Sequence, residues 1–204
     1  MKITMIDYGA SNIRSALKAF EYLGADVLLT GDPADVLRAD KLVLPGVGAF
    51  GSGMDAVREL GLDTAVKERV ANGVPLLGIC VGMQFLFETS DEMGQHNGLG
   101  LVPGDVTRFE LEDPANKVPH MGWNQIEHDE THWLMAGVPS DSYVYFVHSY
   151  FCRPTSPVHT IATTDYEQDF CAVVAHENVY GIQFHPEKSQ KHGLRILQNY
   201  IDLK

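Results

Sequence analysis

A cysteine stands between two glycines at the end of an apolar run. The stretch VPLLGICVGMQFLFE covers residues 74–88 and places Gly78, Cys80 and Gly82 at alternate positions. A buried strand that turns sharply into a helix needs glycines here, because the strained turn and the close helix–strand approach leave no room for a Cβ atom. A cysteine at such a helix start, with Val81 as the first helical residue, is favoured as a thiolate, and the free N–H groups can hold an oxyanion. The pattern predicts a nucleophile, with a buried structural cysteine as the alternative.

A nucleophilic cysteine needs a base and a group that orients the base. The segment YGIQFHPEKS, residues 180–189, supplies His185 and Glu187, two positions apart. In an extended segment such residues point to one side, so Glu187 can accept from one ring nitrogen while the other faces Cys80. Pro186 breaks any continuing strand ladder at this point. The segment predicts a Cys–His–Glu triad, and a solvated turn is its alternative.

A third segment, LVLPGVGAFGSG at residues 42–53, places a glycine-rich turn after a buried strand. Exposed backbone amides in such a turn could donate to a carbonyl oxygen at the carboxyl edge of an open α/β sheet, where these sheets bind ligands. The segment is neither a G-x-G-x-x-G fingerprint nor a P-loop, since it has no G-K-[ST]. A plain turn remains possible on this pattern alone.

These segments need a sheet to bring them together, and the first half of the chain predicts one. Strand-like runs at 2–6, 27–29, 42–44 and 74–79 alternate with helical periodicity. Two apolar faces carry the helical signal: Ile13, Ala16, Leu17 and Phe20, then Leu62, Ala65, Val66 and Val70. Asp32 and Pro33 read as an N-cap and first residue of a short helix. The βαβαβ order predicts an α/β fold with an open, mostly parallel twisted sheet flanked by helices.

The pattern changes after residue 90. Residues 91–100 read as a polar loop, and residues 100–184 contain short strand-like pieces that predict antiparallel strands on or beside the main sheet. The candidate pieces are VTRF, the stretch around Trp123, YVYFVHSYF, TIATT and CAVVAH. A last amphipathic helix carries Leu194, Leu197 and Ile201 on one face. We find no linker or repeat, so one domain over residues 1–204 is expected.

Composition narrows the class of partner. The chain of 204 residues has 27 acidic and 15 basic residues, for a net charge of −12, which argues against a nucleic-acid or anionic-membrane surface. Its three cysteines form no C-x-x-C pair and indicate a reducing compartment. The apolar run near the start of the sequence is too short for the core of a signal peptide. No apolar run approaches the ~20 residues of a membrane helix. We expect a cytoplasmic protein.

Together these segments resemble the class I (triad) glutamine amidotransferase family. The G-x-C-x-G-x-Q elbow of that family is matched by residues 78–84, its H-P-E by residues 185–187, and its oxyanion turn by residues 45–48. The resemblance implies a flavodoxin-like fold and no metal or cofactor. It implies that Cys80 attacks the side-chain amide of glutamine, that His185 protonates the leaving ammonia and then activates water, and that Glu187 orients His185. The implied oxyanion-hole residues are Val47, Gly48 and Val81, and the implied glutamine-binding residues are Gly46, Gly48, Gln84, Ser149 and Tyr150.

Three more segments resemble one branch of this family, the glutaminase subunits that form a heterodimer with a (β/α)8-barrel cyclase in histidine biosynthesis. They are DYGASN at 7–12, PHMGWN at 119–124 and YFVHSY at 145–150. The oxyanion turn also resembles this branch, because it reads PGVGAF where many relatives have P-G-G. Residues 88–116 match little. The implied partner-facing residues are Asn12, Met121, Trp123 and Lys188. Ordinary core packing is the alternative for Met121 and Trp123, and a plain surface charge is the alternative for Lys188. We further hypothesise that a peptide flip in the PGVG turn gates the site when the liganded cyclase docks.

Other interpretations stay open at this point. The chain could serve another synthase, such as the pyridoxal phosphate glutaminase, or be a cysteine hydrolase or peptidase of related fold. It could also be a non-catalytic regulatory module, although such a module has no chemical need for all three triad residues. The segment HDETH at 128–132 has its glutamate at the wrong place for a H-E-x-x-H zinc site and predicts a solvated loop. His148 and His120 are expected to be hydrogen-bonded histidines of the interior rather than second bases.

Overall fold

Five parallel strands form the centre of the molecule. The computed structural model describes residues 2–10, 13–113 and 115–203. The parallel block runs in the order β2-β1-β3-β4-β13. Its strands are β1 (Lys2–Ile6), β2 (Asp26–Thr30), β3 (Lys41–Gly46), β4 (Leu76–Cys80) and β13 (Val179–Ile182). Every residue of β3, β4 and β13 is buried, as expected for parallel strands that are covered on both faces. The predicted parallel sheet is confirmed.

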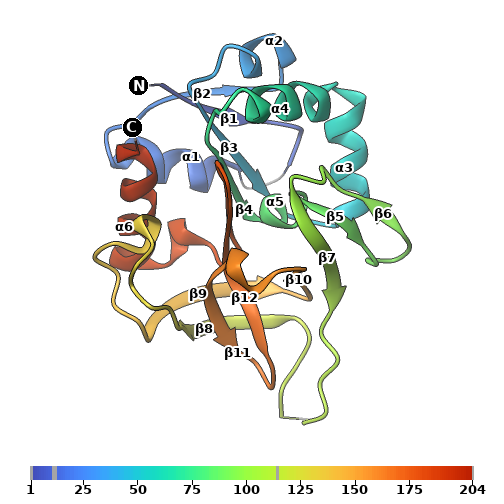
Figure 1. Ribbon diagram of the computed structural model, residues 1–204, viewed down its shortest axis with the longest axis vertical. Coiled ribbons are helices and arrows are strands. Elements are labelled where there is room, and N and C mark those ends of the chain that lie inside the picture. The colour runs from blue at the N-terminus through green and yellow to red at the C-terminus, as the bar shows by residue number, and fades with distance from the viewer. Residues whose placement is uncertain (1, 11–12, 114, 204) are drawn as a thin grey trace.

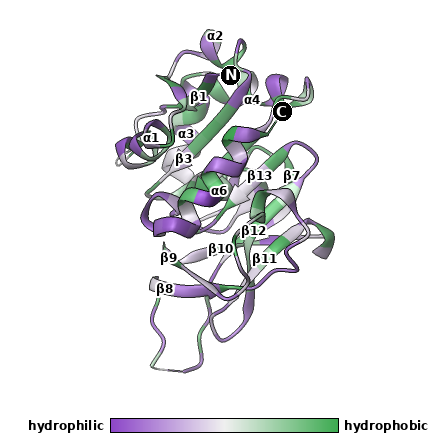
Figure 2. Cartoon of the chain, turned by 90° about the vertical axis from the view of Figure 1, so that its left-hand side faces the viewer, coloured by the Kyte–Doolittle hydropathy of each residue, from purple (hydrophilic) through white to green (hydrophobic). Residues whose placement is uncertain are grey.

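Helices cover both faces of this block. α1 (Ile13–Tyr22) contacts α6 (Gln190–Asp202), and α4 (Leu62–Ala71) contacts α2 (Pro33–Val36) and α3 (Phe50–Glu59). The two groups lie on opposite sides of the strands in Figure 1. In Figure 2, α1 and α6 carry both hydrophilic and hydrophobic residues, as amphipathic helices do. The predicted faces are confirmed: Ile13, Ala16 and Phe20 of α1 and all four of the named residues of α4 are buried.

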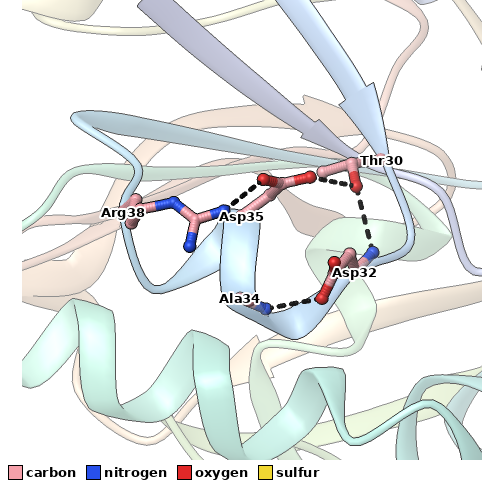
Figure 3. A network of polar contacts seen from close by, with 5 residues as sticks. All are labelled: Thr30, Asp32, Ala34, Asp35 and Arg38. Carbon is pink, nitrogen blue, oxygen red and sulfur yellow. Dashed lines mark hydrogen bonds and ion pairs between the residues drawn. The ribbon is translucent and has the colours of Figure 1, made fainter.

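The short helix α2 is held by its cap, as the sequence predicted. The Asp32 side chain accepts from the Ala34 N–H at 2.8 Å, and Pro33 occupies the first turn. Thr30 joins the same network: its hydroxyl donates to Asp35 at 2.9 Å and accepts from the Asp32 N–H (Figure 3). Arg38 pairs with the other oxygen of Asp35 at 2.7 Å. These contacts fix the connection between β2 and β3.

The C-terminal helix is fixed to the sheet by a buried lysine. The Lys41 ammonium at the start of β3 donates to the carbonyls of Tyr200 at 2.9 Å and Ile201 at 2.7 Å, and also to that of Leu203. The Tyr200 hydroxyl donates to the Leu42 carbonyl at 2.7 Å. A cation at the C-terminus of a helix binds its unpaired carbonyls and complements its dipole. The other end of α6, at Gln190, follows closely on the segment that carries the predicted base.

Mostly antiparallel strands extend the sheet beyond this block, although one pair of the added strands is parallel. From β13 the order continues through β12, β10, β7, β5 and β6, with β11 paired to β12. A separate two-stranded sheet pairs β8 with β9. The bounds are β5 (Phe87–Ser90), β6 (His96–Asn97), β7 (Val102–Arg108), β8 (His120–Ile126), β9 (Ser142–His148), β10 (Tyr150–Pro154), β11 (Thr160–Asp165) and β12 (Asp169–His176). Three short 3-10 helices, η1 (Trp133–Met135), η2 (Pro157–His159) and η3 (Pro186–Lys188), join these elements.

Four local expectations need correction or refinement. The glycine-rich stretch after β3, predicted as a turn, runs into helix α3 at Phe50. The elbow helix α5 (Val81–Gln84) has only four residues and is soon followed by β5. The expected loop at 91–100 contains the short strand β6. The segment YVYFVHSYF is split at Ser149 into β9 and β10, which belong to different sheets. Among the described residues, no helix is long and apolar enough to cross a membrane.

Candidate active site

Cys80 ends β4 and caps the short helix α5. Its backbone has φ 55° and ψ −116°, a region that non-glycine residues occupy only under strain. The flanking glycines are required by close contacts. A Cβ on Gly82 would lie 1.8 Å from the Leu44 carbonyl oxygen, and one on Gly78 would lie 2.6 Å from the Gly82 oxygen. The predicted nucleophile elbow is therefore present, and its geometry aims the Cys80 side chain out of the strand end.

The base and its orienting group come from the turn after β13. The side chains of His185 and Glu187 are only 4% and 5% exposed, and Nδ1 of His185 lies 2.8 Å from Oε1 of Glu187. Burial alone lowers the pKa of His185, but the hydrogen bonds to Cys80 and Glu187 outweigh it and raise the pKa to about 10. The histidine is thus held as an imidazolium between the Cys80 sulfur and the Glu187 side chain. The structure brings together the three residues of the predicted triad.

A cavity of about 290 Å³ lies in front of the triad. Its wall includes Cys80, His185 and six of the residues named from the sequence: Val47, Gly48, Val81, Gln84, Ser149 and Tyr150. Gly46 does not line it. Gly46 pairs with Cys80 in the β3–β4 ladder, and a Cβ there would lie 2.5 Å from the Gly82 nitrogen. Gly48 has φ +95° with nothing within 4 Å of a Cβ, so the turn has open space around it.

Two buried amides support one wall of the cavity. Nε2 of Gln84 donates to the Tyr150 carbonyl at 2.9 Å and to Oε1 of Gln183 at 3.2 Å. Nε2 of Gln183 lies 4.0 Å from the Cys80 sulfur. Sequence reasoning missed Gln183, although it stands two residues before His185. The alternation of side chains along a strand was the signal that could have placed it toward the elbow.

Glu92, a carboxylate that the sequence pattern did not predict as a site residue, also lines the cavity. Glu92 follows β5 in the segment where little was matched, and it lines the cavity beside Gly48 and Ser149. Its Oε2 accepts from the Phe50 N–H at 2.6 Å, so the start of α3 holds it in place. Nothing local in the polar loop marks Glu92 as special. Only the fold brings it to the cavity that Cys80 also lines.

The predicted partner-facing residues fall on one exposed surface where they are described. Met121 and Trp123 of β8 are 62% and 46% exposed, so they are not core residues. The Trp123 ring packs edge-on against Tyr145, and Lys188 places its ammonium 5.6 Å from the centre of the same Tyr145 ring. The His185 N–H donates to the Tyr145 carbonyl, so this surface adjoins the triad. Asn12 lies outside the described residues.

The remaining cysteines and histidines have structural partners. Cys152 and Cys171 are buried opposite each other in β10 and β12. The HDETH segment lies in the loop between β8 and η1, where His132 accepts from the Leu134 N–H. Both ring nitrogens of His148 are hydrogen-bonded, one to the Tyr150 carbonyl and one to His120. His148 lines the cavity, but these hydrogen bonds occupy both of its ring nitrogens, so it is not placed as a second base.

Comparison with known proteins agrees with this geometry. Residues 4–203 match the family described as glutamine amidotransferase class-I. The chain is 48% identical to imidazole glycerol phosphate synthase subunit HisH of Salinibacter ruber, over 98% of this chain and 94% of that one. It is also 48% identical to the protein of the same name from Syntrophotalea carbinolica, over 98% and 100%. A crystal structure of a glutamine amidotransferase shares the fold, with a TM-score of 0.76 at 19% identity, over 98% and 97% of the two chains. The chain belongs to the class I glutamine amidotransferase family.

Proposed function

We propose that this chain is the glutaminase subunit of an imidazole glycerol phosphate synthase. It hydrolyses glutamine to glutamate and ammonia, and it passes the ammonia to a (β/α)8-barrel cyclase subunit in histidine biosynthesis. The single observation that carries the chemistry is the juxtaposition of Cys80, His185 and Glu187, with Cys80 and His185 lining a cavity of about 290 Å³. The relatives that are 48% identical over nearly the whole chain support the choice of synthase.

The reaction follows from the protonation of the triad. The Cys80 sulfur attacks the side-chain carbonyl carbon of glutamine, and the N–H groups of Gly48 and Val81 stabilise the oxyanion. His185, held protonated by Glu187, gives its proton to the leaving nitrogen, so that ammonia departs and a γ-glutamyl thioester remains. The now neutral His185 takes a proton from water, whose oxygen attacks the thioester. Glutamate leaves, and the thiolate–imidazolium pair is restored.

The cavity also suggests how glutamine is selected. A free amino acid carries an α-ammonium group that a residue inside a peptide lacks, and the Glu92 carboxylate is placed to accept from it. The backbone of Ser149 and Tyr150 lines the same cavity and is suited to hold the α-carboxylate. This pairing favours a free amino acid over a peptide, and so favours the glutaminase over a cysteine peptidase.

The cyclase binds the surface formed by Met121, Trp123, Tyr145 and Lys188. That surface holds two exposed apolar side chains and one cation, and aromatic and Met residues are enriched at interface cores. Docking there covers the mouth of the triad from the side of His185 and shifts the PGVG turn toward the conformation that holds the oxyanion. The subunit works as one domain over residues 1–204, in the cytoplasm, where its three free cysteines stay reduced.

The test is glutamate release from glutamine by the purified chain, with and without the cyclase subunit and a cyclase ligand. We expect release to be strong only with the liganded cyclase and absent from the Cys80→Ala variant. A chain that instead cleaves peptides, or that serves a pyridoxal phosphate synthase partner equally well, would overturn the proposal.

A further inference from the structure

A chain of side-chain hydrogen bonds runs from the surface of β8 to the wall of the glutamine cavity. Nδ2 of Asn124 lies 3.3 Å from Nε2 of His120, and Nδ1 of His120 lies 3.2 Å from Nε2 of His148. Nδ1 of His148 then lies 2.8 Å from the Tyr150 carbonyl oxygen. The outer end is anchored as well, because Nδ2 of Asn124 donates to the Asp165 carbonyl at 2.8 Å. The triad mechanism uses none of these side chains.

The acceptor at the inner end fixes the direction of every bond. A carbonyl oxygen can only accept, so Nδ1 of His148 carries the proton and its Nε2 accepts in the neutral ring. His120 must then donate from Nδ1 and accept at Nε2 from the Asn124 amide. Burial lowers the pKa of His148 to about 3 and that of His120 to about 4, which keeps both rings neutral. The chain therefore has one arrangement near neutral pH.

The inner end holds a part of the cavity wall. The Tyr150 carbonyl also accepts from Gln84, so two buried donors fix one oxygen. Ser149 and Tyr150 stand at the break between β9 and β10, where the chain passes from one sheet to the other, and both line the cavity. The Ser149 carbonyl accepts from the Phe109 N–H at 3.1 Å, whereas the side chains of Gln84 and His148 hold the Tyr150 carbonyl.

The outer end belongs to the strand that carries the exposed partner surface. Side chains alternate along β8, so His120 and Asn124 point inward while Met121 and Trp123 are exposed. His120 is further clamped by the rings of Phe146 and Tyr166, which stack on it at 4.8 Å and 4.1 Å between ring centres. A shift of β8 must therefore move His120, and through it His148.

We propose that His148 and His120 are positioning residues that hold the Ser149–Tyr150 wall in its glutamine-binding geometry and tie it to the partner-facing strand β8. This inference rests on the proposed glutaminase function. Neither ring reacts with glutamine. His148 orients the Tyr150 peptide, and His120 fixes the tautomer and orientation of His148.

The test compares His148→Phe, His148→Asn and His120→Phe in the complex with the liganded cyclase, by glutamate release over a range of glutamine concentrations. Phenylalanine removes the donor to Tyr150 and keeps an aromatic ring, so we expect KM for glutamine to rise about five- to ten-fold, with kcat changed much less. An asparagine amide can reproduce the donor from the position of Nδ1, so His148→Asn is expected to recover most of that rise. His120→Phe is expected to raise KM about two- to three-fold.

His176→Phe is the matched control. His176 ends β12 at the opposite edge of the sheet, since it pairs with Val179, which in turn pairs with the start of β4. The KM of the His176→Phe complex for glutamine is expected to equal that of the wild-type complex. If His148→Phe does not fold, as judged by thermal unfolding, the KM of the His120→Phe variant for glutamine decides whether the positioning role stands. An unchanged KM in the folded variants, or an equal rise in His148→Phe and His148→Asn, overturns the positioning role alone. A wild-type complex that releases no glutamate overturns the proposed function, and this inference with it.

Discussion

The elbow makes its sharpest prediction at Gly82, the second residue of α5. A Cβ at this position would lie 1.8 Å from the Leu44 carbonyl oxygen, 2.8 Å from its carbon and 3.2 Å from the Pro45 carbon. All three atoms are backbone of β3, so no side chain can rotate out of the way. Reaching even 3.0 Å from the oxygen requires a movement of about 1.2 Å, the difference between 3.0 and 1.8 Å. The substitution Gly82→Ala must push α5 away from β3.

That movement falls on the reacting groups. The N–H of Val81 and the Cys80 sulfur sit at the start of α5, so they shift with it. A misplacement of about 1 Å in an active site costs about 100-fold in rate, and overpacking a tight contact costs about 1–3 kcal/mol of stability. We therefore expect Gly82→Ala to fold with a loss of about 1–3 kcal/mol in the free energy of unfolding and to lose about 100-fold in kcat/KM for glutamine.

A second glycine separates loss of stability from loss of geometry. Gly73 follows α4 with φ +83° and nothing within 4 Å of a Cβ, so Gly73→Ala adds backbone strain of about 1–2 kcal/mol without a clash. Urea unfolding and glutamate release with the liganded cyclase are measured for both variants. We expect similar destabilisation but full activity in Gly73→Ala. Near wild-type activity in Gly82→Ala, or an equal loss of activity in both, would refute the reasoning.

Three further predictions concern buried or cavity-lining titratable groups. Lys41→Met removes the cation that binds the carbonyls at the end of α6, so urea unfolding should show a loss of about 2–4 kcal/mol, while activity in the cold is retained. Burial lowers the pKa of His148 to about 3 and of His120 to about 4, below the usual 6.5, so the unfolded chain binds protons that the folded chain does not. The free energy of unfolding should therefore fall as pH drops from 6.5 toward 4, by up to about 1.4 kcal/mol per pH unit for each histidine, and less steeply in a variant that lacks both. Glu92→Gln should raise KM for glutamine by about ten-fold or more, with a smaller change in kcat, in steady-state assays.

The parallel half of the fold was predictable because strands that are buried on both faces must be runs of apolar residues. Helix α3 was not, because Gly51 and Gly53 lower helix propensity in its first turn. The structure shows why they are there. A Cβ on Gly53 would lie 2.4 Å from the Phe85 ring, and one on Gly51 would lie 2.5 Å from the His96 ring. Tertiary contacts therefore overrode the local preference, and no local pattern could reveal them.

The placing of the triad was predictable because its chemistry restricts residue types at short spacings. Gly78, Cys80 and Gly82 form one local turn, and His185 and Glu187 form another. Glu92 differs, since it depends on a chain reversal after β5 and on the start of α3, two features that arise only in the folded chain. The break at Ser149 was hidden for a similar reason. A continuous apolar run does not tell where a strand passes from one sheet to another.

The most direct test of the central claim is covalent labelling of Cys80 by the substrate itself. The complex with the liganded cyclase is mixed with glutamine, quenched in acid within the turnover time, and analysed by intact-mass and peptide mass spectrometry. We predict a γ-glutamyl thioester on the peptide that contains Cys80, its absence in Cys80→Ala, and its accumulation when deacylation is slowed. A complex that releases glutamate with no adduct at Cys80, or with full activity in Cys80→Ala, would contradict the proposed triad.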